Sequence, residues 1–299
     1  MKILILGSEG FVGRNLVTGL SKNHIVLCAD LVPASEQTKS SDLINYTQFN
    51  ITDSSSVDKI VKDVDVVIDL VAHSLISSLD DSLQSAKVNI IGLLNVLESC
   101  RKNKIKKIIF TSASSLIGVP SSEAVSEDHR AVPKTSYAIT KLVSEYYLRL
   151  YNEMFGLNFV IFRFFNIYGP HQKNGLIPTL YNRIVKNESV TVFGKGDQIR
   201  DYVFIEDVIP FFEHAILSES VDNNIFNMGT GRGTNITKII EIISETLQTS
   251  PTIDYKPERL GEIGNFVAET TKLESNFGSI PKTNIISGLR QTISWLKSN

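Results

Sequence analysis

The chain has 299 residues, of which 42% are hydrophobic and 21% are charged, so it can bury a large core and does not resemble a disordered chain. Its formal net charge is -2 and its lysines and arginines are scattered, which excludes the basic surface that nucleic acids or anionic membranes attract. Cys28 and Cys100 are far apart and lack metal-ligand spacing, so we predict no disulfide framework and no metal site.

The N-terminal run Met1–Leu6 resembles the start of a signal peptide, but its apolar part ends at Gly7 and no small-residue cleavage site follows. We therefore predict a buried strand there. No later stretch reaches the roughly 18 apolar residues that a membrane-spanning helix requires. We expect a cytoplasmic protein.

Apolar, β-rich runs alternate with segments that can form helices. The predicted strands are Ile3–Leu6, Ile25–Ala29, Val64–Val71, Ile108–Thr111 and Phe159–Phe164. Long helices are predicted near Ala86–Lys102 and Tyr137–Glu153. Runs that are apolar on both faces suit a parallel sheet covered by helices on both sides, so we predict an α/β fold of the Rossmann type, a doubly wound parallel sheet.

The pattern changes from Gly169 onward. Turn signals such as Asn174-Gly175 and Gly194-Lys195-Gly196 separate shorter elements there. This predicts a smaller, loop-rich C-terminal lobe, a typical place for residues that select a substrate.

Gly7, Gly10 and Gly13 follow the first predicted strand and open the predicted helix Phe11–Leu20. Without side chains, the backbone amides and the helix N-terminus can approach a diphosphate, which indicates a dinucleotide-binding loop. The alternative is a tight strand-to-helix turn that needs glycine only for its backbone geometry.

Asp30 ends the second predicted strand, about 20 residues past the glycines, where a carboxylate can bind the adenosine ribose of a dinucleotide. It would repel a 2′-phosphate, and no basic residue follows it directly, so NAD is favoured over NADP. The alternative is a solvated aspartate at a turn.

Tyr137 and Lys141 are four residues apart on a predicted helix and therefore share one face. An ammonium and an oxidised nicotinamide near the phenol both favour the phenolate, so Tyr137 could accept a hydroxyl proton while a hydride leaves for the cofactor. Such a pair on an exposed helix has no function by itself; the glycine loop makes the catalytic interpretation the stronger one.

Thr111, Ser112, Ser114 and Ser115 follow a predicted strand at the carboxyl end of the sheet, where ligands of doubly wound folds bind. A hydroxyl there could bond the reacting oxygen. Serine and threonine also cap helices and fill turns, so for each of them a purely structural role stays open.

In these residues the chain resembles the NAD-dependent sugar-nucleotide epimerase/dehydratase family of extended short-chain dehydrogenases/reductases, whose members include UDP-glucose 4-epimerases. The resemblance covers nearly the whole chain. The matching segments are Gly7 to Gly13, Asp30, Asn89 with Gly92 and Asn95-Val96-Leu97, Tyr137 to Lys141, Arg163 to Pro170, and Thr191 to Val203.

The resemblance implies NAD as cofactor and a nucleotide-diphosphate sugar as substrate. It implies catalytic roles for Ser112, Tyr137 and Lys141. The implied cofactor contacts are Gly7, Gly10, Phe11, Val12, Gly13, Asp30, Asn50, Ile51, Leu70, Ala72, Asn89, Tyr137, Lys141 and Phe165. The implied substrate contacts are Ser114, Asn166, Leu176, Phe193, Arg200 and Arg259. We expect residues 1–166 and 203–225 to form the NAD-binding domain, and residues 167–202 and 226–299 the nucleotide-sugar lobe.

Two departures from the family pattern matter. Asn50-Ile51 stands where the family usually has Asp-Ile or Asp-Leu, so an amide would replace a carboxylate near the adenine. Ala113 stands at the usual catalytic serine or threonine. We therefore assign that role to Ser112, with Ser114 as the alternative.

The same segment bears on the reaction type. The family's 4,6-dehydratases carry an Asp-Glu pair just after the catalytic threonine, and the related decarboxylases keep the glutamate; here those positions are Ser114 and Ser115. Because no acid is present for elimination, 4-epimerisation through a transient 4-keto sugar ranks first. The alternatives are an NAD(H)-dependent reductase of a keto-sugar nucleotide and a non-catalytic dinucleotide-binding sensor. From the family's four-helix interface we also expect a homodimer.

Overall fold

The computed structural model describes residues 1–36, 38–120, 122, 124–258 and 263–299. Its contacts divide the chain into two compact units. The first comprises residues 1–118, 129–164 and 209–226, and the second comprises residues 119–128, 165–208 and 227–299.

The unit boundaries differ from the expected domain boundaries by one or two residues at 165–166 and 226, and by longer segments in two places. Residues 119–128 join the second unit because strand β6 (Ala124–Val125) pairs in parallel with β14 (Asn265–Ala268) there. Residues 203–208 join it because β10 (Ile199–Phe204) pairs with β8 (Asn166–Tyr168). Both pairings join segments far apart in the sequence, so local patterns could not indicate them.

The first unit is built on a seven-stranded sheet, and the pairs with a defined register are parallel. In order across the sheet the strands are β11 (Asn224–Met228), β7 (Asn158–Phe164), β5 (Lys107–Ala113), β4 (Val66–Asp69), β1 (Lys2–Leu6), β2 (Ile25–Asp30) and β3 (Ile44–Gln48). The strand order reverses between β1 and β4, the point where doubly wound folds bind their ligands. The predicted Rossmann-type fold is confirmed.

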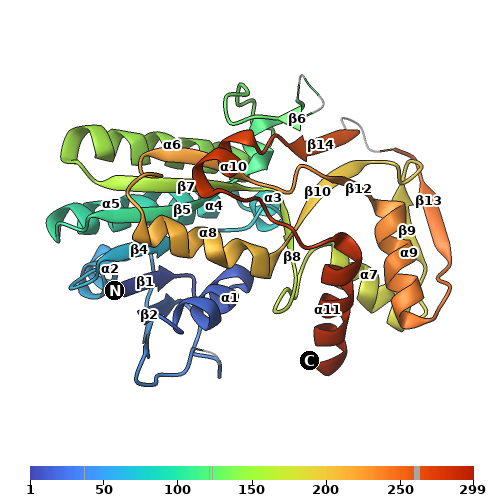
Figure 1. Cartoon of the computed structure of the whole chain (residues 1–299), viewed down its shortest axis with the longest axis horizontal. Coiled ribbons are helices and arrows are strands. Elements are labelled where there is room, and N and C mark those ends of the chain that lie inside the picture. Colours follow the sequence, from blue (N-terminus) through green and yellow to red (C-terminus); the bar gives the residue numbers. More distant parts are fainter. Residues whose placement is uncertain (37, 121, 123, 259–262) are drawn as a thin grey trace. The chain divides into compact units, whose positions relative to one another are not determined.

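Helices cover both faces of this sheet (Figure 1). Helices α5 (Leu93–Lys102) and α6 (Ser136–Phe155) lie on one face, and α1 (Phe11–Leu20) and α8 (Ile205–Leu217) lie on the other. The shorter helices are α2 (Ser54–Ile60), α3 (Ser77–Asp80), α4 (Ser82–Ala86) and a 3₁₀ turn at Ser114–Ile117. One core cluster joins Leu4, Val67 and Ile108 of the strands to Val96 and Leu148 of the helices. These side chains are buried from water, which favours the layered arrangement.

Helix α6 has clear start and stop signals. The Thr135 side chain accepts a hydrogen bond from the Ala138 amide at its N-terminus. Gly156 follows its last residue with φ of +69°, the left-handed conformation that ends many helices.

The helix predicted near Ala86–Lys102 is not one continuous α-helix. Residues Lys87–Gly92 form a π-helical segment before α5 begins. At Gly92 a Cβ atom would lie 2.8 Å from Cγ2 of Ile51, so glycine permits this close approach. Widened turns of this kind often occur at functional sites.

The second unit contains a sheet of strand order β12-β10-β14-β6, with β8 paired to β10, and a separate pair of β13 (Ile253–Lys256) with β9 (Val190–Phe193). Its remaining elements are β12 (Gly233–Asn235), α7 (Leu176–Val185), α9 (Ile236–Leu247), α10 (Thr271–Phe277) and α11 (Ile285–Ser298). Ile177, Leu180, Ile239 and Leu289 pack in its core. The second unit therefore has its own hydrophobic core.

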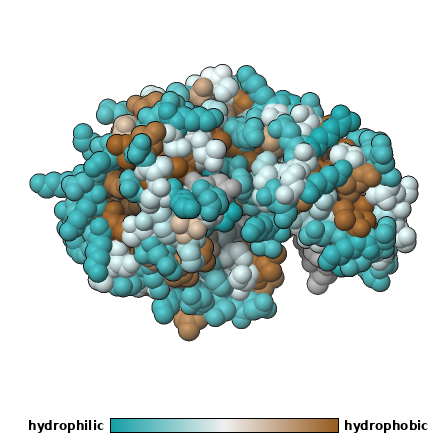
Figure 2. All heavy atoms as spheres, turned by 90° about the horizontal axis from the view of Figure 1, so that it is seen from below, coloured by the Kyte–Doolittle hydropathy of each residue, from teal (hydrophilic) through white to brown (hydrophobic). Residues whose placement is uncertain are grey.

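Figure 2 shows apolar side chains in separate patches among hydrophilic ones on the face that it presents. Scattered apolar residues of this kind are normal on a folded surface. Among the described residues, no helix combines the length and apolar character needed to span a membrane.

Candidate active site

Three glycines build the turn between β1 and α1. Gly7 has φ of +82°, which favours glycine. A Cβ atom on Gly13 would lie 2.2 Å from the Gly7 carbonyl oxygen, so a larger residue does not fit. Gly10 caps α1 without a side-chain hydrogen bond, and Phe11 and Val12 open that helix. The first amides of α1 thus suit an anion such as a diphosphate.

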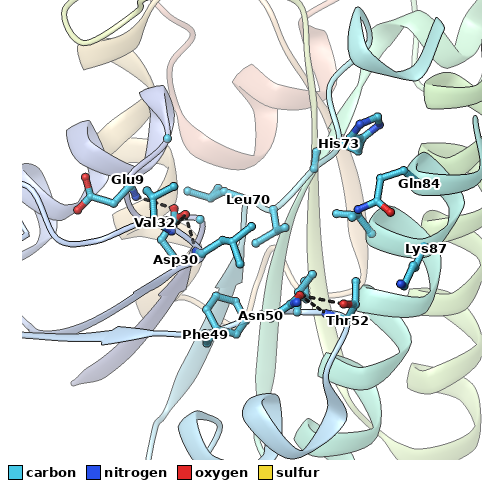
Figure 3. Close-up of a pocket in the computed structure, with 17 residues that line it drawn as sticks. Glu9, Asp30, Val32, Phe49, Asn50, Thr52, Leu70, His73, Gln84 and Lys87 are labelled. Atoms are coloured by element: carbon cyan, nitrogen blue, oxygen red, sulfur yellow. Dashed lines mark hydrogen bonds between the residues drawn. The ribbon is translucent and has the colours of Figure 1, made fainter. Parts of the chain in front are cut away.

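A cavity of about 580 Å³ adjoins this turn within the first unit (Figure 3). The predicted cofactor residues that line it are Gly7, Gly10, Asp30, Asn50, Ile51, Leu70 and Ala72. Its other lining residues include Glu9, His73, Gln84 and Lys87, which sequence reasoning did not identify. Figure 3 shows Glu9 and Asp30 on one side of the cavity and Gln84 and Lys87 on the other. Of the remaining predicted cofactor residues, Phe165 belongs to the second unit.

The Asp30 carboxylate is held by backbone amides. One oxygen accepts from the Glu9 amide at 2.9 Å and the other from the Leu31 amide at 2.7 Å. Nearby, the Asn50 side-chain oxygen accepts from the amide and the hydroxyl of Thr52. The Asn50 oxygen is therefore engaged, and its amino group is the donor that this side chain could offer to a ligand.

Asn89 of the π-helical segment is buried and links three segments of the chain. Its side-chain oxygen accepts from the His73 amide at 2.7 Å, and its amino group donates to the Thr140 hydroxyl at 2.9 Å. It does not line the cavity described above. In this structure Asn89 positions the segment after β4, next to the cavity, rather than facing the cavity itself.

Tyr137 and Lys141 lie one turn apart on α6, which packs against β5. The Lys141 ammonium is 5.7 Å from the Tyr137 ring centre and 4.5 Å from the Phe110 ring centre. It donates to the Thr111 carbonyl oxygen at 2.7 Å, and Lys141 is only 2% exposed. The structure therefore brings the predicted proton acceptor and its cationic neighbour together.

Burial shifts the pKa values of both groups. It lowers the pKa of Lys141 to about 8, against the opposing charges of Asp69 and Glu145. It raises the pKa of Tyr137 to about 12. Near neutral pH Lys141 therefore carries its charge and Tyr137 its proton, so the phenol needs a further positive charge nearby to act as a base.

Ser112 lies on β5 two residues after Phe110, and so on the sheet face that α6 covers. It is 2% exposed, and its hydroxyl has no hydrogen-bond partner among the described residues. A buried hydroxyl without a partner is costly unless a ligand completes it. Ser114 opens the following 3₁₀ turn and is also buried.

Sequence reasoning missed a group of buried charges beside this pair. Asp69 ends β4 and is 1% exposed; burial raises its pKa to about 6, although the Lys141 charge opposes the shift. Arg163 of β7 makes two hydrogen bonds, of 3.0 and 2.8 Å, with the Glu145 carboxylate of α6. Asp69 could have been found from the sequence, because it is a charged residue at the end of an apolar strand. The contact between Arg163 and Glu145 could be found only from the tertiary structure.

The predicted substrate residues of the second unit occupy several elements. Asn166 of β8 donates to the Asp201 carbonyl oxygen at 3.1 Å, and Arg200 of β10 donates to the Ile263 carbonyl oxygen at 2.7 Å. Phe193 ends β9, and Leu176 begins α7. Arg259 lies outside the described residues.

Asp201, which sequence reasoning did not single out, organises this part of the second unit. Its carboxylate is fully buried and accepts from the amides of Thr230, Gly231 and Ala268 and from the Thr230 hydroxyl. Several charge-assisted hydrogen bonds on one carboxylate hold the neighbouring loop and strand in place. Arg200 precedes Asp201 on β10, so these hydrogen bonds also hold the strand segment that carries Arg200.

Three comparisons place the chain among known proteins. The model of the NAD dependent epimerase/dehydratase family matches residues 3–229. The UDP-glucose 4-epimerase of Thermotoga maritima, solved with UDP-glucose, aligns with a TM-score of 0.91 at 28% identity over 100% of this chain and 99% of that one. The UDP-glucuronic acid 4-epimerase of Bacillus cereus, solved with UDP-glucuronic acid and NAD, aligns with a TM-score of 0.92 at 28% identity over 100% and 99%. A UDP-N-acetyl-alpha-D-glucosaminuronate decarboxylase of Bacillus cytotoxicus is 29% identical over 316 residues, covering 99% of this chain and 98% of the relative.

Proposed function

Because this chain belongs to the NAD-dependent epimerase/dehydratase family and its cofactor is NAD, we propose that it inverts the C4 centre of a UDP-hexose through a transient 4-keto sugar. The reaction has no net redox change, so NAD is regenerated in each turnover.

The residues of the first unit fit NAD. A side chain at Gly13 would meet the backbone of Gly7 and Ser8, so glycine lets the turn close and bring the first amides of α1 toward a diphosphate. Asp30 lines the adjoining cavity and suits the adenosine ribose. The Ser112 hydroxyl, which has no partner in the part of the chain that the structure describes, is a buried group with which a bound molecule would form a hydrogen bond.

One observation carries the choice of epimerisation. Tyr137 and Lys141 lie on α6, and Ser112 lies on the face of β5 that α6 covers. The segment from Thr111 to Gly118 contains no carboxylate. The resemblance implies that the dehydratases and decarboxylases of the family use an acid at the positions that Ser114 and Ser115 occupy here. Proton transfer at a hydroxyl needs only a phenol and its cationic neighbour.

We assign each residue a role. NAD, when bound, would supply the acceptor and then the donor for the C4 hydride. Tyr137 accepts the proton of the C4 hydroxyl and later gives it back, and the Lys141 charge favours the phenolate. Ser112 donates a hydrogen bond to the C4 oxygen, with Ser114 as the alternative donor.

The nucleotide and the sugar diphosphate are assigned to the second unit. Arg200 and Arg259 would bind the diphosphate, since guanidiniums bind phosphate oxygens in pairs. Asn166, Leu176 and Phe193 would bind the remainder of the nucleotide sugar. UDP is favoured because the similar proteins named above act on UDP-sugars.

The test is to incubate purified protein, without added NAD, with UDP-glucose, UDP-N-acetylglucosamine and their uronic acids, and to follow C4 epimers by proton NMR. Interconversion without added cofactor supports the proposal and identifies the sugar. Turnover only after NADH and a keto-sugar nucleotide are supplied would show a reductase. Release of carbon dioxide from a uronic acid would show a decarboxylase, and NAD binding without any turnover would favour a sensor.

We also propose that the protein is a homodimer formed through α6 and its neighbours. Several apolar side chains on this side of the first unit are exposed, which is costly for an isolated chain. They are Leu83, Ile91, Ile139, Tyr146, Leu150 and Met154. Analytical ultracentrifugation of the protein and of Tyr146→Glu tests this: a dimer that the substitution converts to a monomer supports it, and a monomer in both contradicts it.

A further inference from the structure

Glu9 places a carboxylate inside the glycine turn, directly before Gly10. It is 9% exposed and lines the cavity beside the turn. Its amide donates to the Asp30 carboxylate at 2.9 Å, while its own carboxylate points away from the cavity (Figure 3). Glu9 therefore contacts the proposed ribose carboxylate through its backbone and has its side chain available for another role.

The Glu9 side chain holds the loop that follows β2. One carboxylate oxygen accepts from the Ser35 amide at 2.9 Å and from the Thr38 hydroxyl, and Thr38 is fully buried. Burial opposes ionisation, but the hydrogen bonds of Thr38 and Ser35 and the charge of Arg14 hold the pKa of Glu9 below its ordinary value. Glu9 is therefore charged at neutral pH, and its carboxylate interacts with Ser35, Thr38 and Arg14.

Arg14, on the first turns of α1, is the cation in contact with Glu9. Its guanidinium donates to the second Glu9 carboxylate oxygen at 2.8 Å and to the Glu9 carbonyl oxygen at 3.1 Å. The Arg14 side chain is 20% exposed, whereas the Glu9 side chain is 2% exposed. The guanidinium bonds to the Glu9 carbonyl oxygen and the Asp30 carboxylate bonds to the Glu9 amide, so the backbone of one residue links the two groups. Glu9 and Asp30 line the cavity, and Arg14 contacts it through Glu9.

NADP differs from NAD by a phosphate on the adenosine 2′-oxygen, which is the place assigned to Asp30. A protein binds such a phosphate best with a guanidinium that offers two parallel donors. Arg14 has this chemistry and contacts Glu9, the residue whose amide bonds to Asp30, but its Nε donor and one Nη2 donor are held by Glu9. Together Glu9, Arg14 and Asp30 leave one net negative charge there, which repels a phosphate dianion.

We propose that Glu9 determines cofactor specificity: by holding Arg14 in an ion pair it denies a 2′-phosphate its cationic partner, and by its amide it fixes Asp30. Arg14 is thus a latent NADP-binding residue. The inference concerns the cofactor alone and does not depend on which sugar the enzyme converts.

The test measures dissociation constants of NADH and NADPH by isothermal titration calorimetry, with full-length protein from which bound cofactor has been stripped. In Glu9→Gln the amide oxygen still accepts from Ser35 and Thr38, but Arg14 loses its ionic partner. We expect the ratio of the NADPH to the NADH dissociation constant to fall at least tenfold, which corresponds to about 1.4 kcal/mol. In the double variant Glu9→Gln/Arg14→Gln we expect the wild-type ratio to return.

The matched variant Glu9→Asp keeps the charge but shortens the side chain. It therefore tests whether loss of the contacts with Ser35 and Thr38 is enough to change the ratio of the two dissociation constants. We expect its ratio to stay within about threefold of wild type, well short of the tenfold change that corresponds to about 1.4 kcal/mol. Equal weakening of both cofactors in Glu9→Gln would overturn the proposal, as would a changed ratio that persists without Arg14. Thermal unfolding checks that each variant is folded, and Glu9→Ser replaces Glu9→Gln if that variant is not.

Discussion

Replacing Gly13 by alanine tests the idea that the glycine turn leaves no room for a side chain. The new Cβ atom would lie 2.2 Å from the Gly7 carbonyl oxygen and 2.7 Å from Cα of Ser8. Both are backbone atoms, so no side-chain rotation relieves the overlap. Alanine gains about 1 kcal/mol over glycine inside a helix, whereas overpacking of this severity costs about 3 kcal/mol. The clash therefore dominates, with a net loss of about 2 kcal/mol.

The assay combines thermal unfolding with the NAD content of the purified variant, measured after acid release. A net loss of about 2 kcal/mol lowers the melting temperature by about 3 °C in a chain of 299 residues, and a displaced turn should also lower NAD retention. Gly264→Ala is the matched control, because no described atom lies within 4 Å of its Cβ position. If Gly13→Ala melts and retains NAD like this control, the steric reasoning is wrong.

Three further predictions concern charged and polar groups. Tyr137→Phe removes the proton acceptor, so we expect turnover to fall about 10²- to 10⁴-fold in the NMR assay with NAD content unchanged. Asp69→Asn removes a negative charge that favours protonated Lys141, so we expect the pKa of Lys141 to fall from about 8 to a lower value. The alkaline limb of the kcat profile should therefore move to lower pH. Arg163→Ala leaves the Glu145 carboxylate buried without this partner, and we expect denaturant unfolding to show a loss of about 3 to 5 kcal/mol.

Each of these has a result that would contradict it. Wild-type turnover in Tyr137→Phe would remove the phenol from the mechanism. An unshifted pH profile in Asp69→Asn would show that its charge does not act on Lys141. For Arg163→Ala the control is Lys238→Ala, which breaks an exposed ion pair with Glu241 and should leave stability nearly unchanged; equal effects of the two would contradict the role of burial.

The sequence predicted five strands of the first sheet, with ends that differ from the observed ones by one or two residues. It missed the other two strands, β3 and β11. Ile44–Gln48 is a partly exposed edge strand with mostly polar residues and lacks the apolar run used as the signal. In Asn224–Met228, asparagines at the first and fourth positions interrupt the apolar run. It also missed the π-helical segment Lys87–Gly92, since its widening depends on the contact of Gly92 with Ile51 and not on local propensity.

Local chemistry determined much of this protein from the sequence alone. The glycines at Gly7, Gly10 and Gly13, an aspartate at a strand end and a Tyr-x-x-x-Lys pair together indicate a dinucleotide-dependent function. They can be read from the sequence because backbone freedom and helical spacing are local properties. The alternation of predicted strands and helices indicated the fold class, because the spacing of apolar residues shows which faces of each element are buried.

Only the tertiary structure decided the contacts between distant segments. It set Arg14 against Glu9 and both beside Asp30, put Asp69 within the field of Lys141, and paired Arg163 with Glu145. Electrostatic energies depend on distance and burial in three dimensions, so the same residues in the sequence carry no such information until the sheet and its helices bring them together.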